Sequence, residues 1–218
     1  MIVAIDKPMG WTSFDVVKKV RQITGESKVG HAGTLDPFAE GVLVIGIGRQ
    51  STRQLGEISN SIKSYRASLR LGEMTDTLDN TGKIIREMSI PQLVEIEVAG
   101  VLAGFLGPQM QVPPMFSAKK VDGRRLYKLA RNQITVDREP VAITIENIEL
   151  IDLGISSIEF SVTCSKGTYV RQLGSDIATA LGTVGHLTRL KRVDAGRFTL
   201  DDCINFEEIE EQWMSSII

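Results

Sequence analysis

The stretch Gly30-His31-Ala32-Gly33-Thr34-Leu35-Asp36-Pro37, with the apolar run Val42-Leu43-Val44-Ile45 that follows it, is the most informative part of this chain. The two glycines permit positive φ angles and the close approach of another backbone. Pro37 disfavours the helical conformation at Asp36, and the apolar run is typical of a buried strand. A carboxylate and an imidazole therefore lie on a stiff loop that precedes a core strand, which is typical of a functional site.

The sequence on either side of this loop predicts several helices and strands. Residues 2–5 predict a short strand, and Thr12-x-x-Asp15 is the capping box of an amphipathic helix that ends at Gly25. A change in the alternation of apolar residues near Glu146-Asn147 predicts a β-bulge. Further strands are expected at 65–71, from 83, at 141–150, 158–164 and 184–193, and further helices at 89–104, after Gly123, at 170–181 and after Asn205.

The order of these elements indicates the fold class. Strands outnumber helices, and the two kinds of element do not alternate along the chain. This order favours an α+β fold with a largely antiparallel sheet. The length of 218 residues fits one domain, 1–218, whose core is large enough to need no metal or disulfide. Within it, residues 111–138 are irregular and basic, and residues 199–218 form a short acidic tail.

The cysteines and the apolar runs argue against several classes of protein. The two cysteines, Cys164 and Cys203, belong to no CxxC or Cys/His cluster, which fits a reducing cytoplasm and argues against structural zinc. No apolar run approaches the ~20 residues of a membrane span. Asp6 comes too early for a secretory signal peptide. We therefore expect a cytoplasmic protein without a membrane or metal partner.

The charge distribution favours a nucleic-acid partner, although the formal net charge is −2. The last 20 residues hold six of the 27 acidic side chains and no lysine or arginine, so the rest of the chain carries 25 basic against 21 acidic side chains, or +4. Local positive patches suit a phosphate backbone, although each cluster taken alone equally fits a solvated face. The clusters are Lys119, Lys120, Arg124, Arg125, Lys128 and Arg131, and then Arg189, Lys191, Arg192 and Arg197.

Three short segments carry side chains that are unusual in purely structural elements. Tyr65 lies on the apolar face of a predicted strand, and 186–192 is a basic strand with apolar interruptions. Arg171 lies in the first turn of a predicted helix, where the helix dipole disfavours a cation, so the sequence predicts an anionic partner for it. Each feature alone is ordinary, and their weight comes from their occurrence together with Asp36.

With these segments in view, the chain resembles the TruB family of tRNA pseudouridine synthases, in the family's motif order, from about Ile5 to about Phe198. The resemblance implies the pseudouridine synthase fold, with a mixed, largely antiparallel central sheet flanked by helices. The matching segments are Asp6-Lys7-Pro8-x-Gly10-x-Thr12-Ser13, 30–37, Lys63-Ser64-Tyr65, Gly72-x-x-Thr75-Asp76-Thr77-x-Asp79, 111–119, Gly167-Thr168-Tyr169-Val170-Arg171 and Leu190-Lys191-Arg192.

The resemblance also implies a role for each matching residue. Asp36 matches the catalytic aspartate, and Arg171 matches the arginine that pairs with it. His31 matches the histidine that fills the gap left by the flipped-out nucleotide, and Tyr65 matches the tyrosine that stacks on the target uracil. Tyr169 and Leu190 match other pocket residues, and Lys7 matches a residue behind the catalytic loop. Residues 111–138 match an insertion that clamps the RNA stem-loop, and the expected contacts with the RNA backbone are Lys119, Lys120, Arg124, Arg125, Lys128 and Arg192.

The implied reaction agrees with these residue types. Conversion of uridine to pseudouridine breaks an N-glycosidic bond and remakes it to carbon while the uracil stays in the pocket, so we expect no metal or other cofactor. One ionised carboxylate is enough, either as nucleophile at the sugar or as base on it. A neighbouring Arg171 would hold Asp36 ionised. Stacking on Tyr65 and contacts with phosphates would offset the cost of extruding the base.

One feature departs from the usual pattern of the family. Bacterial TruB proteins commonly continue into a C-terminal PUA domain, whereas this chain ends at Ile218 after the acidic tail. We therefore expect a catalytic domain without the PUA domain. It would act as a monomer on the T stem-loop of tRNA, at the uridine of conventional position 55.

Two alternatives remain open at this point. The first is a non-catalytic RNA-binding or tRNA-folding protein of the same fold, and the second is a synthase that acts on a different RNA. A small-molecule hydrolase is disfavoured because the chain has two histidines and no G-x-S-x-G or H-E-x-x-H motif. A nucleotide enzyme is disfavoured because the chain has no Walker A motif or complete dinucleotide fingerprint.

Overall fold

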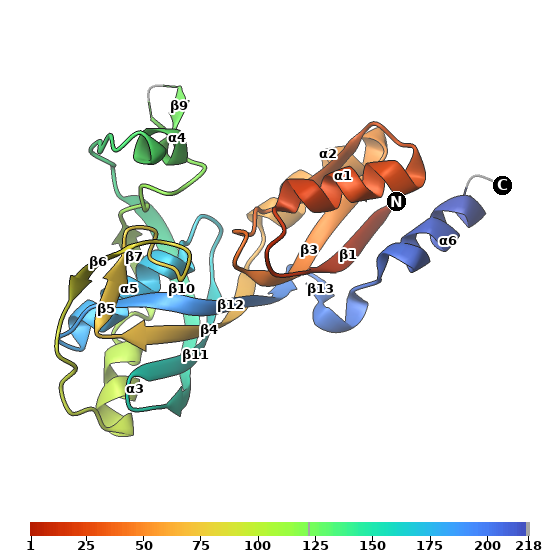
Figure 1. Cartoon of the computed structure of the whole chain (residues 1–218). Helices are drawn as coiled ribbons and strands as arrows, with labels where there is room; N and C mark the ends of the chain where they lie inside the picture. The colour runs from red at the N-terminus through yellow and green to blue at the C-terminus, as the bar shows by residue number, and fades with distance from the viewer. Residues whose placement is uncertain (122, 217–218) are drawn as a thin grey trace. The chain divides into compact units, whose positions relative to one another are not determined.

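The computed structural model describes residues 1–121 and 123–216 (Figure 1). The chain divides into two compact units. We call residues 1–66 together with those from 190 onward the aspartate unit, because it contains Asp36, and residues 67–189 the insertion unit, because it contains 111–138. The strands β4 (Lys63–Leu71) and β12 (Gly185–Ala195) each contribute residues to both units.

The sheet confirms the predicted α+β class. Its strand order is β1-β3-β12-β4-β11-β10-β7, with β2 paired to β3 and β13 paired to β12. The strand β3 pairs antiparallel with β1 and β2, β10 pairs antiparallel with β7 and β11, and β12 pairs antiparallel with β13. By contrast, β3 and β12 are parallel, with Glu40 opposite Lys191 and Gly41 opposite Arg192. The parallel pair matters for function because it lies at the end of the Asp36 loop.

The aspartate unit combines this part of the sheet with three helices. Its strands are β1 (Ile2–Lys7), β2 (Val29–Ala32), β3 (Glu40–Ile47) and β13 (Phe198–Thr199), with the ends of β4 and β12. Its helices are α1 (Ser13–Thr24), α2 (Arg49–Asn60) and α6 (Phe206–Ser216), with a 3₁₀ turn at Leu200–Asp202. The helix α2 packs on β2 and β3, and α6 packs on α1. Its core includes Ala4, Ala32, Val42, Val44, Leu55 and Ala195.

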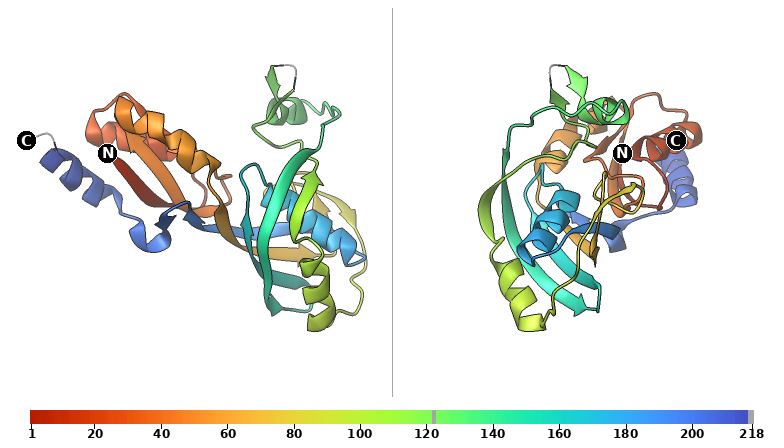
Figure 2. Two further views of the ribbon diagram at one scale, coloured as in Figure 1. Left: turned by 180° about the vertical axis from the view of Figure 1, so that it is seen from behind. Right: turned by 60° about the vertical axis from the view of Figure 1, so that its left-hand side comes forward.

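The insertion unit is built on the long ribbon of β10 (Val141–Leu153) and β11 (Ser157–Cys164), seen in Figure 2. Its other strands are β5 (Glu73–Thr75), β6 (Ile84–Glu87), β7 (Gly107–Gln111), β8 (Lys120–Val121) and β9 (Arg124–Arg125). Its helices are α3 (Glu95–Ala103), α4 (Leu126–Arg131) and α5 (Val170–Ala180), and α3 packs on β10. The alternating apolar residues of β11 are buried, as predicted, on the core face of the sheet.

Several local predictions are confirmed. The main-chain and side-chain donors of Thr12 bond the Asp15 carboxylate at 2.8 and 2.6 Å, and the Asp15 N–H returns a 3.1 Å bond. Gly25 ends α1 with φ +67°. The strand register shifts between Ile145 and Asn147, where the β-bulge was expected. Asn205 caps α6, since its side-chain oxygen accepts from the Glu208 N–H at 2.9 Å.

Three local predictions are wrong. Residues 30–32 belong to β2 and not to the loop, because they pair with β3, and their own sequence has no strand pattern. The helix α2 was missed because Leu55 and Ser51 are its buried residues, so its apolar stripe is too sparse to detect. The helix α3 begins at Glu95 and not at 89, with the acidic residues Glu95 and Glu97 in its first turn.

No helix within 1–121 and 123–216 combines the length and the apolar character that a membrane crossing requires.

Gly41 makes a close approach that leads to the first prediction. Its φ is +104°, and a Cβ built there would lie 2.2 Å from the carbonyl oxygen of Arg192. Gly41→Ala should lower the free energy of unfolding by about 3 kcal/mol or more, since it combines backbone strain with a main-chain clash. Urea unfolding measures this loss.

A matched control separates the clash from the strain. Gly48 also has a positive φ, +88°, but nothing lies within 4 Å of a Cβ built on it. Gly48→Ala therefore carries the backbone strain alone and should lose less stability than Gly41→Ala. Equal losses in the two variants would contradict the close approach of β12 to Gly41.

Candidate active site

The loop that carries Asp36 joins β2 to β3 and is fixed on both sides of the carboxylate. The Ser13 hydroxyl, at the start of α1, accepts from the Leu35 N–H at 2.9 Å and lies 3.1 Å from the Leu35 carbonyl, to which it donates. The Gly10 N–H donates to the Pro37 carbonyl at 2.7 Å. Leu35 is buried, whereas Asp36 is half-buried. Neighbouring elements thus hold the backbone of the loop and leave the carboxylate partly accessible.

Two buried cations lie in the same unit as this loop. Lys7 is 0% exposed, and its Nζ donates to the carbonyls of Pro8 at 2.9 Å and Trp11 at 2.6 Å. Arg192 is 1% exposed, and its guanidinium donates to the carbonyls of Val42 at 2.7 Å and Gly33 at 3.1 Å. Long basic side chains are rarely buried this completely unless the surrounding structure uses the charge.

The titration of Lys7 places it in electrostatic contact with the loop. Burial lowers the pKa of Lys7 to about 8, Asp36 opposes the shift by raising it, and the positive charge of Arg192 lowers it further. Lys7 therefore still carries its proton at neutral pH, and its charge interacts with the Asp36 carboxylate.

This shift predicts how stability depends on pH. Between about pH 8 and the ordinary value of 10.5, the unfolded chain holds the Lys7 proton and the folded chain does not, so the contribution of Lys7 to stability rises with pH. At pH 7 the buried cation costs about 3 kcal/mol relative to neutral lysine. We expect the unfolding free energy of the wild type to rise relative to Lys7→Met across this window.

Urea unfolding at several pH values checks the expectation. Lys18→Met, which alters an exposed lysine on α1, serves as the control and should show a constant difference from the wild type. A pH-independent difference for Lys7→Met would contradict the lowered pKa.

His31 lies on β2 opposite Ile45, five residues before Asp36 in the sequence. Its side chain is half-buried, and among the described residues its Nδ1 atom is buried without a hydrogen-bond partner. Burial, and then the charge of Arg192, lowers the pKa of His31. The imidazole is therefore neutral at pH 7 and suits contact with a nucleobase better than contact with a phosphate.

The two pocket residues predicted on strands are buried in the aspartate unit. Tyr65 on β4 is 8% exposed and Leu190 on β12 is 6% exposed. Sequence reasoning gave no role to Lys63, two residues before Tyr65. Its Nζ donates to the carbonyls of Ile58, Ser59 and Ser61 and so caps the end of α2. Its presence in the motif Lys63-Ser64-Tyr65 was a signal that could have identified it.

Within the insertion unit, Arg171 has an anionic partner in Asp79. Arg171 is 3% exposed, and its Nε lies 3.6 Å from the Asp79 carboxylate. The guanidinium also donates to the carbonyls of Thr77 and, at 2.8 Å, Phe116. The other Asp79 oxygen accepts from the hydroxyls of Thr77 and Thr81. Arg171 thus contacts two segments, residues 77–79 and the one that contains Phe116, and its pairing with Asp36 stays a prediction.

Tyr169 lies just before α5, at the root of the insertion 111–138. Its N–H donates to the Gln111 side-chain oxygen at 2.8 Å, and its carbonyl accepts from the Gln111 amide at 3.1 Å. This pair of bonds ties the end of β7 to the start of α5. The Tyr169 side chain is half-buried.

The basic residues of the insertion gather around one hollow. The short ribbon β8–β9 and the helix α4 supply four exposed cations, and Leu129 and Ile134 add apolar lining. Lys119 lies outside this lining, and its Nζ donates to the Glu139 carbonyl at 3.2 Å. The four cations at the hollow are Lys120, Arg124, Arg125 and Lys128.

Arg192 does not fit its predicted contact with the RNA backbone. A guanidinium that is 1% exposed and bonded to the carbonyls of Gly33 and Val42 does not present its charge to a phosphate in solution. We therefore assign it to the Asp36 loop. The sequence alone placed it in a basic cluster because burial depends on the parallel pairing of β12 with β3.

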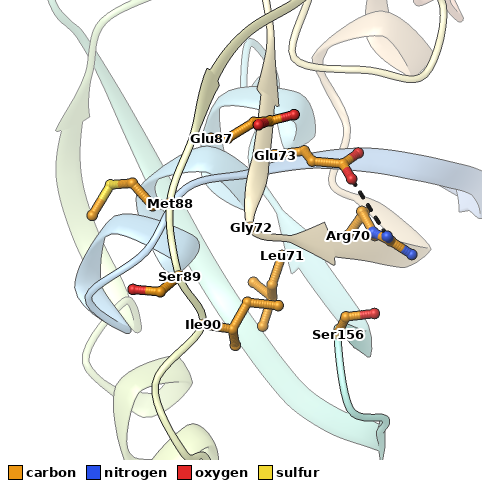
Figure 3. A pocket seen from close by; sticks show the side chains of 9 residues that line it. All are labelled: Arg70, Leu71, Gly72, Glu73, Glu87, Met88, Ser89, Ile90 and Ser156. Carbon is orange, nitrogen blue, oxygen red and sulfur yellow. Dashed lines mark hydrogen bonds and ion pairs between the residues drawn. The ribbon is translucent and has the colours of Figure 1, made fainter.

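A second hollow in the insertion unit, drawn in Figure 3, lies beside the Arg70–Glu73 ion pair, in which the charged atoms are 3.4 Å apart. Met88 and Ile90 supply its apolar lining. No predicted site residue is among the described residues that line it.

Comparison with known proteins identifies the class. Residues 21–170 match the family model for the N-terminal domain of TruB family pseudouridylate synthases, and residues 171–216 match that for the C-terminal domain of tRNA pseudouridylate synthase B. The boundary between the matches lies at the start of α5 and not at a boundary between the two units.

Curated relatives and solved structures agree with this match. tRNA pseudouridine synthase B of Clostridium tetani is 44% identical over 217 residues, which cover all of this chain and 75% of the relative. That of Protochlamydia amoebophila is 46% identical over 209 residues, which cover 95% of this chain and 79% of the relative. A solved Cbf5-Nop10-Gar1 complex contains a chain with TM-score 0.75 and 26% identity, and the match covers all of this chain and 56% of that one.

The fold and these matches define a pseudouridine synthase, which is an isomerase. The chain belongs to the TruB family of pseudouridylate synthases, as the sequence motifs indicated.

Proposed function

We propose that the protein converts the uridine at conventional position 55, in the T-loop of tRNA, to pseudouridine, with Asp36 as the catalytic residue. The observation that carries this proposal is the Asp36 loop, whose backbone is fixed by Ser13 and Gly10 while the carboxylate stays half-exposed. The substrate is proposed because relatives that are 44–46% identical are named tRNA pseudouridine synthase B. The expected compartment is the cytoplasm, and the expected active form is a monomer with both units in one catalytic domain.

The proposed reaction exchanges one bond of the nucleotide for another. The bond from uracil N1 to the sugar C1′ breaks, the uracil turns in the pocket, and a bond from C5 to C1′ forms. The hydrogen of C5 leaves as a proton, and N1 gains a proton. Asp36 acts at the sugar, either as nucleophile or as base. Exclusion of water keeps the detached uracil from being lost.

The remaining site residues receive roles that agree with their surroundings. Tyr65 stacks on the uracil, with Leu190 and Tyr169 as further pocket residues. His31 fills the gap left in the RNA stack, for which a neutral imidazole is suited, and the pKa of His31 is lowered. Lys7 supports the loop from behind. Arg171 is the proposed ion-pair partner of Asp36.

The insertion is proposed to bind the RNA backbone through its basic residues. Changing Lys119, Lys120, Arg124 and Arg125 together to alanine should weaken tRNA binding and flatten its salt dependence, because each lost phosphate contact removes about 0.7–0.9 from the slope of log K against log salt. Filter binding from low to high salt measures both quantities.

The control removes the same number of charges elsewhere. Lys18, Lys19, Lys28 and Arg49 are exposed residues of the aspartate unit, and their joint change to alanine should leave most of the slope in place. If the slope of log K against log salt is unchanged in the insertion variant, its basic cluster is a solvated surface that does not contact RNA.

The experiment that tests the function follows the proton lost from C5. An unmodified tRNA transcript with tritium at uridine C5, and the isolated T stem-loop with the same label, are incubated with the protein. Release of tritium from both RNAs supports the proposal. Binding without release would favour a non-catalytic RNA-binding protein, and release only from other RNA would favour a different substrate.

A further inference from the structure

Arg192 occupies an unusual position for a charged residue. It is the largest of the fully buried side chains among the described residues. Within the same residues, it forms no ion pair. Its hydrogen bonds go to the carbonyls of Val42 and Gly33. Burying a guanidinium without a carboxylate partner costs free energy. We therefore expect the buried Arg192 side chain to have a role beyond packing.

The two carbonyls that Arg192 binds mark the two ends of the catalytic loop. Gly33 follows β2 and begins the loop, and Val42 lies two residues into β3, where the loop has ended. One rigid guanidinium therefore fixes both ends against each other across Asp36. Lysine has no planar fork and cannot reproduce this span with the same geometry.

Backbone contacts reinforce this clamp. Arg192 pairs in parallel with Gly41, and the absence of a Cβ at Gly41 lets the two main chains come this close. At the other end of the loop, a Cβ built on Gly33, whose φ is +76°, would lie 3.4 Å from a guanidinium nitrogen of Arg192. Gly41 thus admits the main chain of Arg192 at one end of the loop, and Gly33 lies against its guanidinium at the other.

The charge of Arg192 also acts on its surroundings. It lowers the pKa of both Lys7 and His31. The hydrogen bonds and the charge of Arg192 therefore both act on the buried surroundings of the loop and not on solvent.

We propose that Arg192 is a positioning residue for catalysis, which clamps the ends of the Asp36 loop and thereby sets the place of the carboxylate. The expected effect of Arg192 on the reaction rate rests on the proposed function. Its structural consequence, that Arg192 joins the two ends of the loop, does not depend on activity.

The test uses Arg192→Met, which removes the charge and the fork, and Arg192→Lys, which keeps the charge alone. Single-turnover tritium release from the labelled tRNA should fall about 100-fold in Arg192→Met, as expected for a displaced catalytic group, and should partly recover in Arg192→Lys. The Kd for tRNA and its salt slope should equal those of the wild type. Lys18→Met, at an exposed cation of α1 in the same unit, is the control and should keep the wild-type rate.

Hydrogen exchange without RNA gives a readout besides activity. Peptides that cover 33–41 should exchange faster in Arg192→Met, while those of β10 and β11 stay protected. If the wild type releases no tritium, the proposed function fails, and the exchange result alone then decides the clamp. Unchanged exchange in 33–41, a flatter salt slope, or equal loss of protection in both units would overturn the inference. If Arg192→Met does not fold, Arg192→Lys decides by the same measurements.

Discussion

Asp36→Asn should abolish the release of tritium from uridine C5, with a fall of about 10⁴-fold or more in the single-turnover rate. An amide of the same shape can serve neither as nucleophile at the sugar nor as base on it. Asparagine keeps the shape of the side chain, and Ser13 and Gly10 hold the loop backbone, so the variant should fold and keep its tRNA affinity within about twofold.

Asp6→Asn is the control for this result. Asp6 is an exposed aspartate of the same unit, 3.4 Å from Lys191, and its amide variant should keep the wild-type rate. An Asp36→Asn protein that still works within tenfold of the wild type would remove Asp36 from the centre of the reaction.

Arg171→Lys should lower the turnover rate by about 100-fold, because a single ammonium cannot bind Asp79 and the carbonyls of Thr77 and Phe116 at once. Since the charge remains, the loss of stability should be smaller than the roughly 3–5 kcal/mol of a broken buried ion pair. Urea unfolding and single-turnover release separate the two effects.

Arg70→Lys provides the comparison for Arg171→Lys. Its side chain is 46% exposed in the pair with Glu73, so both the rate and the stability should change little. A wild-type rate in Arg171→Lys would show that turnover does not need the planar guanidinium. It would contradict the proposed role of Arg171.

The predictions that depend on local sequence are the ones the structure confirms. The capping box of Thr12 and Asp15, the positive φ of Gly25 and the bulge after Ile145 each depend on residues close in the chain. The motif around Asp36 helped to indicate the family because its glycines, aspartate and proline occur at a fixed spacing.

Other features could not be predicted because they depend on contacts between distant segments. Whether Arg192 faces RNA or the core is decided by the pairing of β12 with β3, which the sequence does not specify. The sequence predicted an anion for Arg171, yet its contact with Asp79 depends on the fold, because the two residues are far apart in the chain. The strand β2 is likewise held by β3 and not by its own side chains.

The most direct measurement maps the modified nucleotide itself. Unmodified tRNA is incubated with the wild type or with Asp36→Asn, treated with a carbodiimide that leaves a stable adduct on pseudouridine, and copied by reverse transcriptase. We expect one new stop, at the T-loop uridine of conventional position 55, with the wild type and none with Asp36→Asn. A stop at another uridine, or the same stop with Asp36→Asn, would contradict it.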